Sequence, residues 1–391
     1  MSVREVSRRL LVEKKPGSLG ALTGLRFLAA SLIVVEHSSA FGLQLPRFGY
    51  DHGVSFFFVL SGFILTYVHP SIANRHEAGM FIWYRVARVW PAHVVMLFVT
   101  IIVLGQKLTF TALPNLALIH AWIPWSQYFF SYNAVSWSIS TEMAFYFSFL
   151  FLIYRWEETY WWKLCVAAAL LLLTIVASNN LGVPTYRENP DGLNTAGLIY
   201  VNPVGRLLEF VVGMACFLLF QWLRKRVTPN ILLFSALEIA AIAALYFTMS
   251  RGLTTLVVWY SGGSVGNGTK EWLSHSSSLP SCAIAVVVFA FGAGILSRIL
   301  SSGLLITLGE ISFSLYLTHQ VINNFYLSRI KPPYGIGAAL LCAAAALLAS
   351  YCLWRFIELP ARRTLRRVAV SASSGASIFG AGASRRQSPS A

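Results

Sequence analysis

The sequence predicts an all-α polytopic integral membrane protein, a bundle of about ten transmembrane helices with both termini in the cytosol. Hydrophobic residues make up 56% of the 391 positions, and the mean hydropathy is +0.64. Charged residues account for only 12%, whereas soluble globular chains have roughly 25%. This composition excludes an ordinary soluble domain.

Ten apolar stretches are long enough to cross about 30 Å of hydrocarbon as helices. An even number of spans places both termini on the same side. The stretch 111–125 is short and contains Pro114 and Pro124, so we expect it to be interfacial or re-entrant. The ten expected spans are 22–41, 52–69, 86–105, 136–154, 163–178, 202–221, 231–249, 280–298, 306–328 and 336–357.

Basic residues are distributed unequally between the two sides of this topology. Of the 30 Lys and Arg residues, 21 lie on the side of the termini or at span ends that face it, eight lie on the other side or at span ends that face it, and Arg26 is counted within its span. The positive-inside rule therefore predicts cytosolic termini and a multi-pass protein of the cell inner (plasma) membrane. Basic loops beside anionic lipid headgroups explain the net charge of +15, so membrane lipids are expected partners and nucleic acid is not.

Three segments are expected along the chain. Residues 1–21 form a basic cytosolic tail, and residues 22–357 form the transmembrane domain. Residues 358–391 are first basic and then rich in Ser, Ala and Gly, which is typical of a disordered tail. The five cysteines all lie within apolar spans without paired spacing, so we expect neither a disulfide framework nor a metal site.

The first span carries an arginine and a histidine, Arg26 and His37, in one apolar run. A charge at the centre of a membrane helix costs at least about 2.5–3.5 kcal/mol, so such residues usually face a polar interior. Eleven positions correspond to about 16 Å along a helix and to nearly three full turns. Both side chains are therefore expected on one face, with the cation near the cytosol and the titratable base in the outer half.

The third span begins with two further arginines, Arg85 and Arg88, which are neighbours on one helix face. Together with Arg26 they predict a cluster of three guanidinium groups near the inner surface. Because guanidinium binds phosphate in a bidentate manner, this cluster favours a pocket for a phosphorylated cytosolic ligand. The alternative is that the arginines only anchor the helix at the lipid interface.

The fourth and ninth spans contribute Glu142 and His319. The direction of each span places both in the outer half of the membrane, at a depth similar to that of His37. A histidine beside a carboxylate is a common general base, so three such groups from three spans indicate catalysis or proton transport. Structural hydrogen bonding is the alternative for each residue alone. Arg206 and Glu209, three positions apart, are expected to pair structurally.

Five blocks of the sequence carry a family resemblance. They are Arg26 and His37 with ten residues between them, Gly53–Phe63, Arg85-x-x-Arg88 followed by Pro91, Ser136–Tyr146 with Glu142, and Ile311–His319. In this order, over about residues 20–363, they resemble the acyltransferase-3 family of integral membrane O-acyltransferases that modify surface and exported carbohydrates. Thr23 and Ser55 depart from the pattern, since many members have an acidic residue at these places.

The resemblance implies transfer of an acyl group, usually acetyl, from cytosolic acyl-CoA to a hydroxyl of a carbohydrate or glycolipid acceptor on the outer face. Arg26, Arg85 and Arg88 would then bind the phosphates of the coenzyme. His37 would act as general base or carry the acyl group itself. Glu142 would orient or charge-balance a histidine, and His319 would be a second base or an acceptor contact. No metal is expected.

The main rival interpretation is a proton-coupled secondary transporter in which His37, Glu142 and His319 relay protons. The arginine cluster favours the transferase, because a proton relay does not need three phosphate-type cations at one surface. A transporter of this kind typically also has paired broken helices from inverted repeats, and the sequence has none that we recognise.

Overall fold

The structure is a computed structural model that describes residues 19–365 apart from positions 47, 251 and 333. Most of the two expected tails, 1–18 and 366–391, lies outside the described residues. No strand occurs in the part of the chain that is described. Its helices in chain order are α2 (Gly20–His37), η1 (Ser38–Phe41), η2 (Tyr50–His52), α3 (Gly53–Val68), α4 (Arg75–Leu104), α5 (Ala112–Leu116), η3 (His120–Trp122), α6 (Ser126–Phe129), η4 (Ala134–Ser136), α7 (Trp137–Leu152), α8 (Trp156–Asn180), η5 (Ala196–Tyr200), α9 (Pro203–Arg224), α10 (Ile231–Met249), α11 (Gly252–Tyr260), α12 (Asn267–Ser276), α13 (Leu279–Ala290), α14 (Ile295–Leu300), α15 (Gly303–Arg329), α16 (Ile336–Leu353) and η6 (Trp354–Glu358).

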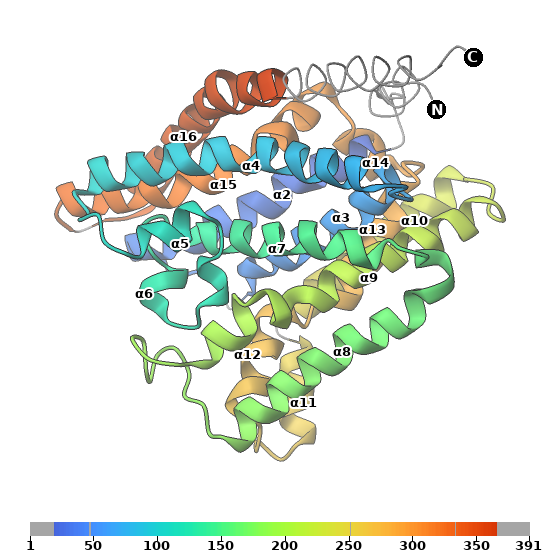
Figure 1. Ribbon diagram of the computed structural model, residues 1–391, viewed down its shortest axis with the longest axis horizontal. Helices are drawn as coiled ribbons and strands as arrows, with labels where there is room; N and C mark the ends of the chain where they lie inside the picture. Colours follow the sequence, from blue (N-terminus) through green and yellow to red (C-terminus); the bar gives the residue numbers. More distant parts are fainter. Residues whose placement is uncertain (1–18, 47, 251, 333, 366–391) are drawn as a thin grey trace, which may run out of the picture.

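Nine helical stretches among the described residues are long and apolar enough to cross a membrane. Each corresponds to one of the ten expected spans, so the all-α polytopic membrane fold is confirmed. The long helices lie side by side as a bundle (Figure 1). The nine stretches are Gly20–Phe41, Tyr50–Val68, Arg75–Leu104, Ala134–Leu152, Trp156–Asn180, Ala196–Arg224, Ile231–Met249, Asn267–Ala290 and Ile336–Leu365.

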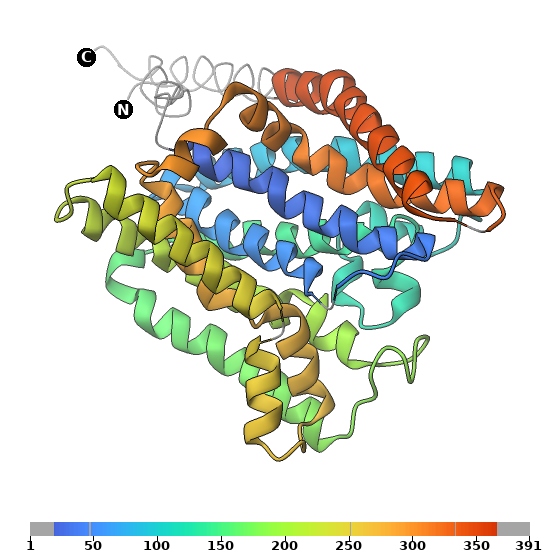
Figure 2. The same cartoon turned by 180° about the vertical axis from the view of Figure 1, so that it is seen from behind.

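The remaining expected span, 306–328, is the helix α15, which is not among the nine. It has 27 residues, enough to extend about 40 Å. Its buried face carries polar residues such as Ser312, His319 and Asn323, which makes it less apolar than the others. α15 packs against α2 on one side and α16 on the other (Figure 2). It is an interior helix whose polar face is turned toward the protein.

Glycines allow α3 and α9 to approach closely, and these two helices form the most extensive helix pair of the bundle. A Cβ atom on Gly62 would overlap the carbonyl oxygen of Phe210, and one on Gly213 would overlap that of Val59. Small residues at such positions are the usual means of bringing membrane helices together. Gly62 lies in the Gly53–Phe63 block, so this block supplies one of the two glycines in these close contacts between α3 and α9.

Asparagine side chains begin three of the long helices. Asn74 accepts a hydrogen bond from the backbone N–H of Glu77 at the start of α4, and Asn202 and Asn230 cap α9 and α10 in the same way. Such caps satisfy backbone donors that a helix leaves unpaired at its first turn. The stretch 111–125, by contrast, forms only the short helices α5 and η3, so the prediction that it does not span as a regular helix is confirmed.

Candidate functional site

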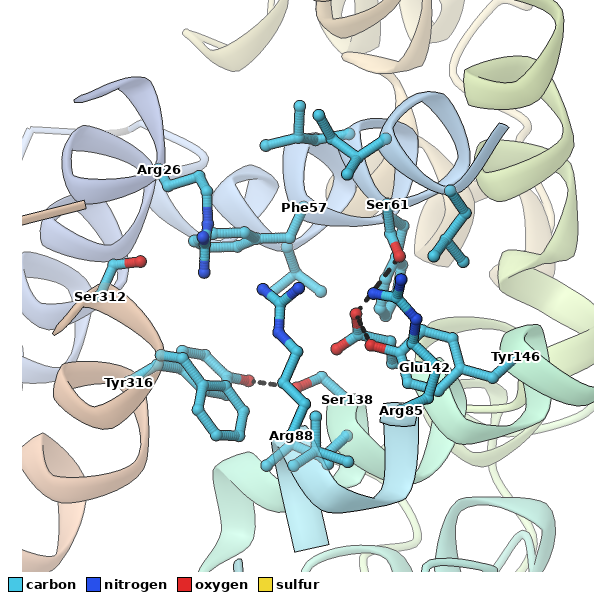
Figure 3. A pocket seen from close by; sticks show the side chains of 18 of the residues that line it. Arg26, Phe57, Ser61, Arg85, Arg88, Ser138, Glu142, Tyr146, Ser312 and Tyr316 are labelled. Atoms are coloured by element: carbon cyan, nitrogen blue, oxygen red, sulfur yellow. Dashed lines mark hydrogen bonds between the residues drawn. The ribbon is translucent and has the colours of Figure 1, made fainter. Parts of the chain in front are cut away.

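A cavity of about 240 Å³ lies between α2, α3, α4, α7 and α15. Its lining includes four of the six residues singled out in the sequence. Arg26 comes from α2, Arg85 and Arg88 come from α4, and Glu142 comes from α7 (Figure 3). The predicted gathering of the three arginines is therefore observed, and we call this space the basic cavity.

Arg26 and Arg88 direct their guanidinium groups into the basic cavity (Figure 3). Within the described part of the chain, neither makes a hydrogen bond or a salt bridge. Two like charges held close together without protein partners are unfavourable in a low-dielectric interior. The arrangement is suited to an anion that supplies the missing hydrogen-bond acceptors.

Arg85 is held in place by its surroundings at the wall of the same cavity. Its Nη2 donates to Nε2 of His69, 3.3 Å away, and its guanidinium lies over the rings of Phe81 and Tyr146 at 5.4 and 5.8 Å. Burial and the nearby Arg85 lower the pKa of His69 to about 4, so its imidazole is neutral at physiological pH and can accept this hydrogen bond. Cation–π contacts of this kind fix the plane of an arginine.

Glu142 does not meet a histidine, contrary to the expectation from the sequence. Its Oε1 accepts hydrogen bonds from Tyr146 Oη at 2.5 Å and from Ser61 Oγ at 3.3 Å. Ser138, Glu142 and Tyr146 are spaced four residues apart, so they share the face of α7 that lines the basic cavity. Glu142 and the histidines were expected at similar depth in the membrane, but they do not meet because their side chains lie on helix faces that point to different neighbours.

A second cavity, of about 470 Å³, adjoins the first. Val54 and Tyr316 line both cavities and separate them. We call this space the histidine cavity, because His37 and His275 line it. The other residues used below that line it are Asp51, Trp137 and Tyr200.

His37 and His319 lie together, as their positions in two spans had suggested. Nε2 of His319 is 3.2 Å from Nδ1 of His37, and the ring centroids are 5.0 Å apart. Nδ1 of each ring also lies near a backbone carbonyl, at 2.9 Å from Ile33 O and 3.1 Å from Leu315 O. These carbonyls require the N–H on Nδ1 when the rings are neutral. His37 then keeps an unprotonated Nε2, the form that a general base or nucleophile needs.

A charged cluster at the histidine cavity was missed in the sequence. Nδ1 of His275 contacts Oδ2 of Asp51, and its Nε2 lies 3.4 Å from Oε1 of Glu271. Asp51 belongs to the short helix η2, and His275 lies 224 positions later in α12. A single histidine in what looked like an outer loop gave no spacing signal. Only the Asp51–His52 pair directly before the Gly53–Phe63 block marked the place.

Arg206 and Glu209 form the predicted ion pair, with Nε and Oε2 3.2 Å apart and both side chains almost fully buried. Arg206 also donates to Ser276 Oγ and to the carbonyl oxygen of His275. Ser55 donates to Glu209 Oε1 at 2.9 Å. The pair thus supports the end of α12 that carries His275, and its role here is structural. Among the described residues no group of three His, Cys, Asp or Glu side chains is placed to hold a metal ion.

The structure so far defines a class: a polytopic helical membrane protein with a basic cavity and a histidine cavity back to back in its interior. The chain belongs to the acyltransferase-3 family, because the family profile described as "Acyltransferase domain" matches residues 19–355. The resemblance seen in the five sequence blocks is confirmed, and the protein is a multi-pass membrane O-acyltransferase.

Two kinds of relatives accompany this match. The acyltransferase MdmB of Streptomyces mycarofaciens is 26% identical over 389 residues, which cover 89% of this chain and 93% of that protein. The O-acetyltransferase OatA of Staphylococcus aureus is 27% identical over 391 residues, covering 91% of this chain but only 59% of OatA. The peptidoglycan O-acetyltransferase OatA of Listeria monocytogenes is 26% identical over 374 residues. No solved structure matches the chain.

Proposed function

We propose that the protein moves an acyl group, most simply acetyl, from cytosolic acyl-CoA to a hydroxyl of a carbohydrate acceptor on the opposite face of the cell inner membrane. The observation that carries this proposal is the back-to-back arrangement of the basic cavity and the histidine cavity. Only Val54 and Tyr316 are common to both linings. An acyl group that passes these two side chains leaves a site for an anionic donor and enters a site with an unprotonated imidazole nitrogen.

The charge of the basic cavity supports coenzyme A as the donor. Three arginines and one carboxylate leave a net charge of +2 at neutral pH, which suits a pyrophosphate and a 3′-phosphate. The volume of about 240 Å³ lies below the roughly 300–1,000 Å³ of a typical small-molecule pocket. We infer that this space takes the narrow pantetheine arm, with the phosphates near Arg85 and Arg88 and the thioester toward Tyr316.

His37 is the residue that we place at the reaction. Its Nε2 takes the proton of the acceptor hydroxyl while the hydroxyl oxygen attacks the thioester carbonyl. The carbon–sulfur bond then breaks, and the coenzyme leaves as a thiolate that takes up a proton. A route in which His37 first carries the acyl group uses the same nitrogen. His319 holds the tautomer in both routes, and we place Glu142 in the donor site, where it orients Tyr146 and Ser61.

The names of the relatives support acetyl as the acyl group and a carbohydrate as the acceptor. Two of them are named O-acetyltransferases, and one is named a peptidoglycan O-acetyltransferase. We infer from these names that acetyl is the first acyl group to test, and that a cell-surface glycan or glycolipid is the first acceptor.

The experiment measures transfer of labelled acetyl from acetyl-CoA to total cell-surface glycan by purified protein in lipid. We expect label in the glycan with the wild type, loss of transfer with retained coenzyme binding in His37→Ala, and loss of coenzyme binding in Arg88→Ala. Two exposed residues give matched controls, His76→Ala and Arg224→Ala, which should behave like the wild type. Failure of the wild type to bind coenzyme A would overturn the proposal and favour a transporter.

A further inference from the structure

We propose that Asp51, held by His275, is the acceptor-binding carboxylate of the histidine cavity, and that this cavity selects neutral or amine-bearing sugars over anionic ones. The inference rests on the proposed function and extends it to the class of acceptor. It starts from a cluster that the acyl transfer described above does not use.

The two ring nitrogens of His275 both face carboxylates, Asp51 on one side and Glu271 on the other. Each nitrogen must carry a proton to donate to its carboxylate, so the ring is an imidazolium. It has no N–H left for a substrate. Its role is to fix Asp51 by one carboxylate oxygen, Oδ2.

The other oxygen of Asp51, Oδ1, makes no hydrogen bond to the residues that the structure describes. Asp51 lines the histidine cavity together with His37. A carboxylate oxygen accepts hydrogen bonds from hydroxyl or ammonium groups and cannot donate. It is therefore placed to hold one hydroxyl of a sugar while another hydroxyl faces His37.

Aromatic rings support this carboxylate from the side. The ring of Tyr200 packs on His275 with a centroid distance of 4.1 Å, and Trp137 lies 4.7 Å from Tyr200. Thr195 donates to Glu271 at 2.9 Å and so holds the second carboxylate behind the imidazolium. Trp137 and Tyr200 also line the cavity, and apolar rings with a few fixed polar groups are the usual composition of a small-molecule site. The C–H faces of a sugar ring can pack on these rings.

Charge gives the selectivity. The imidazolium of His275 lies between two carboxylates, Asp51 and Glu271, while Arg206 is already paired with Glu209. The formal charges of the imidazolium and its two carboxylates sum to −1 in a partly desolvated space, where electrostatic interactions are stronger than in water. A sugar that carries a carboxylate or a phosphate is repelled there, whereas a neutral or ammonium-bearing sugar is accepted.

The test measures binding of three labelled glycosides to the purified protein in lipid nanodiscs by equilibrium dialysis. They are the ethyl, 2-aminoethyl and carboxymethyl glycosides of one hexose, so the ring hydroxyls are identical and only the charge differs. For the wild type we expect the carboxymethyl glycoside to bind at least tenfold more weakly than the other two. Asp51→Asn should weaken binding of the ethyl glycoside about tenfold.

Coenzyme A binding, measured on the same preparations, shows that the variants are folded and separates the two proposals. The exposed carboxylate Asp191 gives the matched control, and Asp191→Asn should bind all three glycosides like the wild type. Equal binding of the three glycosides, no glycoside binding at all, or an Asp51→Asn protein with wild-type affinity would each overturn the inference while coenzyme binding persists. Loss of coenzyme A binding in the wild type would instead overturn the proposed function.

Discussion

The two cavities differ in whether the charged groups that line them have protein partners. In the basic cavity, Arg26 and Arg88 point at open space and make no hydrogen bond or salt bridge within the described chain. In the histidine cavity, both ring nitrogens of His275 face carboxylates. Nδ1 of His37 faces both Nε2 of His319 and the backbone carbonyl oxygen of Ile33. Charged groups without protein partners are available to bind a ligand, whereas groups that already contact other side chains keep those side chains in fixed positions.

The difference indicates separate roles for the two cavities on either side of Val54 and Tyr316. The basic cavity is suited to binding, since a charged ligand satisfies it. The histidine cavity is suited to orientation, because His37 and His275 there each have neighbours that determine where their protons lie. Substitutions of the arginines in the first should therefore change affinity for the donor, and substitutions that disturb His37 in the second should change turnover.

The largest effect among the tests of this division is expected at His319. His319→Ala removes the ring that faces Nδ1 of His37, so His37 loses its fixed tautomer and orientation. We expect kcat for acetyl transfer to fall about 100-fold, within the range of general-base contributions, while KM for acetyl-CoA stays unchanged. His319→Gln, whose Oε1 can replace the Nε2 acceptor, should restore part of kcat. An alanine variant that keeps full turnover would remove His319 from the site.

The next effect concerns the kind of cation in the basic cavity. Arg88→Lys keeps the charge but loses the planar fork that binds a phosphate in a bidentate manner. We expect the Kd of acetyl-CoA to rise about tenfold, because a hydrogen bond to a charged group contributes roughly 1.5–3 kcal/mol. The turnover at saturating donor should change little. A variant with wild-type Kd but reduced turnover would contradict the division between binding and orientation.

Much of the basic cavity could be predicted from the sequence, and the reason is helix geometry. Arg85 and Arg88 are three positions apart, and the directions of two spans bring Arg26 to the same end. His37 and His319 were likewise expected at one depth. The expected contact between Glu142 and a histidine was wrong, because depth in the membrane does not determine the direction of a side chain around the helix axis. Tyr146 follows Glu142 by one helical turn, but the contact with Ser61 is visible only in the packing of α3 against α7.

The cluster of Asp51 and His275 could not be predicted, for a different reason. Asp51 lies in a short turn between two spans, and His275 lies in a helix that the hydropathy pattern places largely outside the membrane core. No helical periodicity relates the two, and the loops that bring them together follow no spacing rule. Pairing over 224 positions comes from tertiary structure alone.

A smaller effect is expected at the partition between the cavities. The Tyr316 hydroxyl donates to the carbonyl oxygen of Val135 and accepts from Ser138 Oγ, both at 2.9 Å. Tyr316→Phe removes these two hydrogen bonds, which contribute about 0.5–1.5 kcal/mol each, and loosens the partition. We expect hydrolysis of acetyl-CoA without acceptor to rise about threefold, measured as free thiol. Tyr246→Phe, at an exposed position, is the control and should leave hydrolysis unchanged.

The smallest effect concerns His69, which binds Arg85 at the edge of the basic cavity. Burial and the neighbouring guanidinium lower the pKa of His69 to about 4 from its usual 6.5. The neutral ring therefore accepts from Arg85 throughout the range from pH 8 to pH 5. As pH falls further toward 4, the ring takes up a proton, loses its acceptor and repels the guanidinium. The stabilising contribution of neutral His69 is thus fully present above pH 6.5 and is lost as pH falls through 4.

Two substitutions isolate this effect from other groups that titrate, including the phosphates of the donor. His69→Gln keeps an acceptor for Arg85 without a titrating ring, and His69→Ala keeps neither. We expect the ratio of acetyl-CoA affinities, wild type over His69→Gln, to be nearly constant between pH 8 and pH 5 and to fall at most about twofold by pH 4, where about half of the rings are protonated. His69→Ala should bind acetyl-CoA about threefold more weakly than His69→Gln at every pH, because alanine offers Arg85 no hydrogen-bond acceptor. A ratio that changes between pH 7 and pH 6 would show that His69 titrates near its usual pKa and would contradict this account of the contact with Arg85.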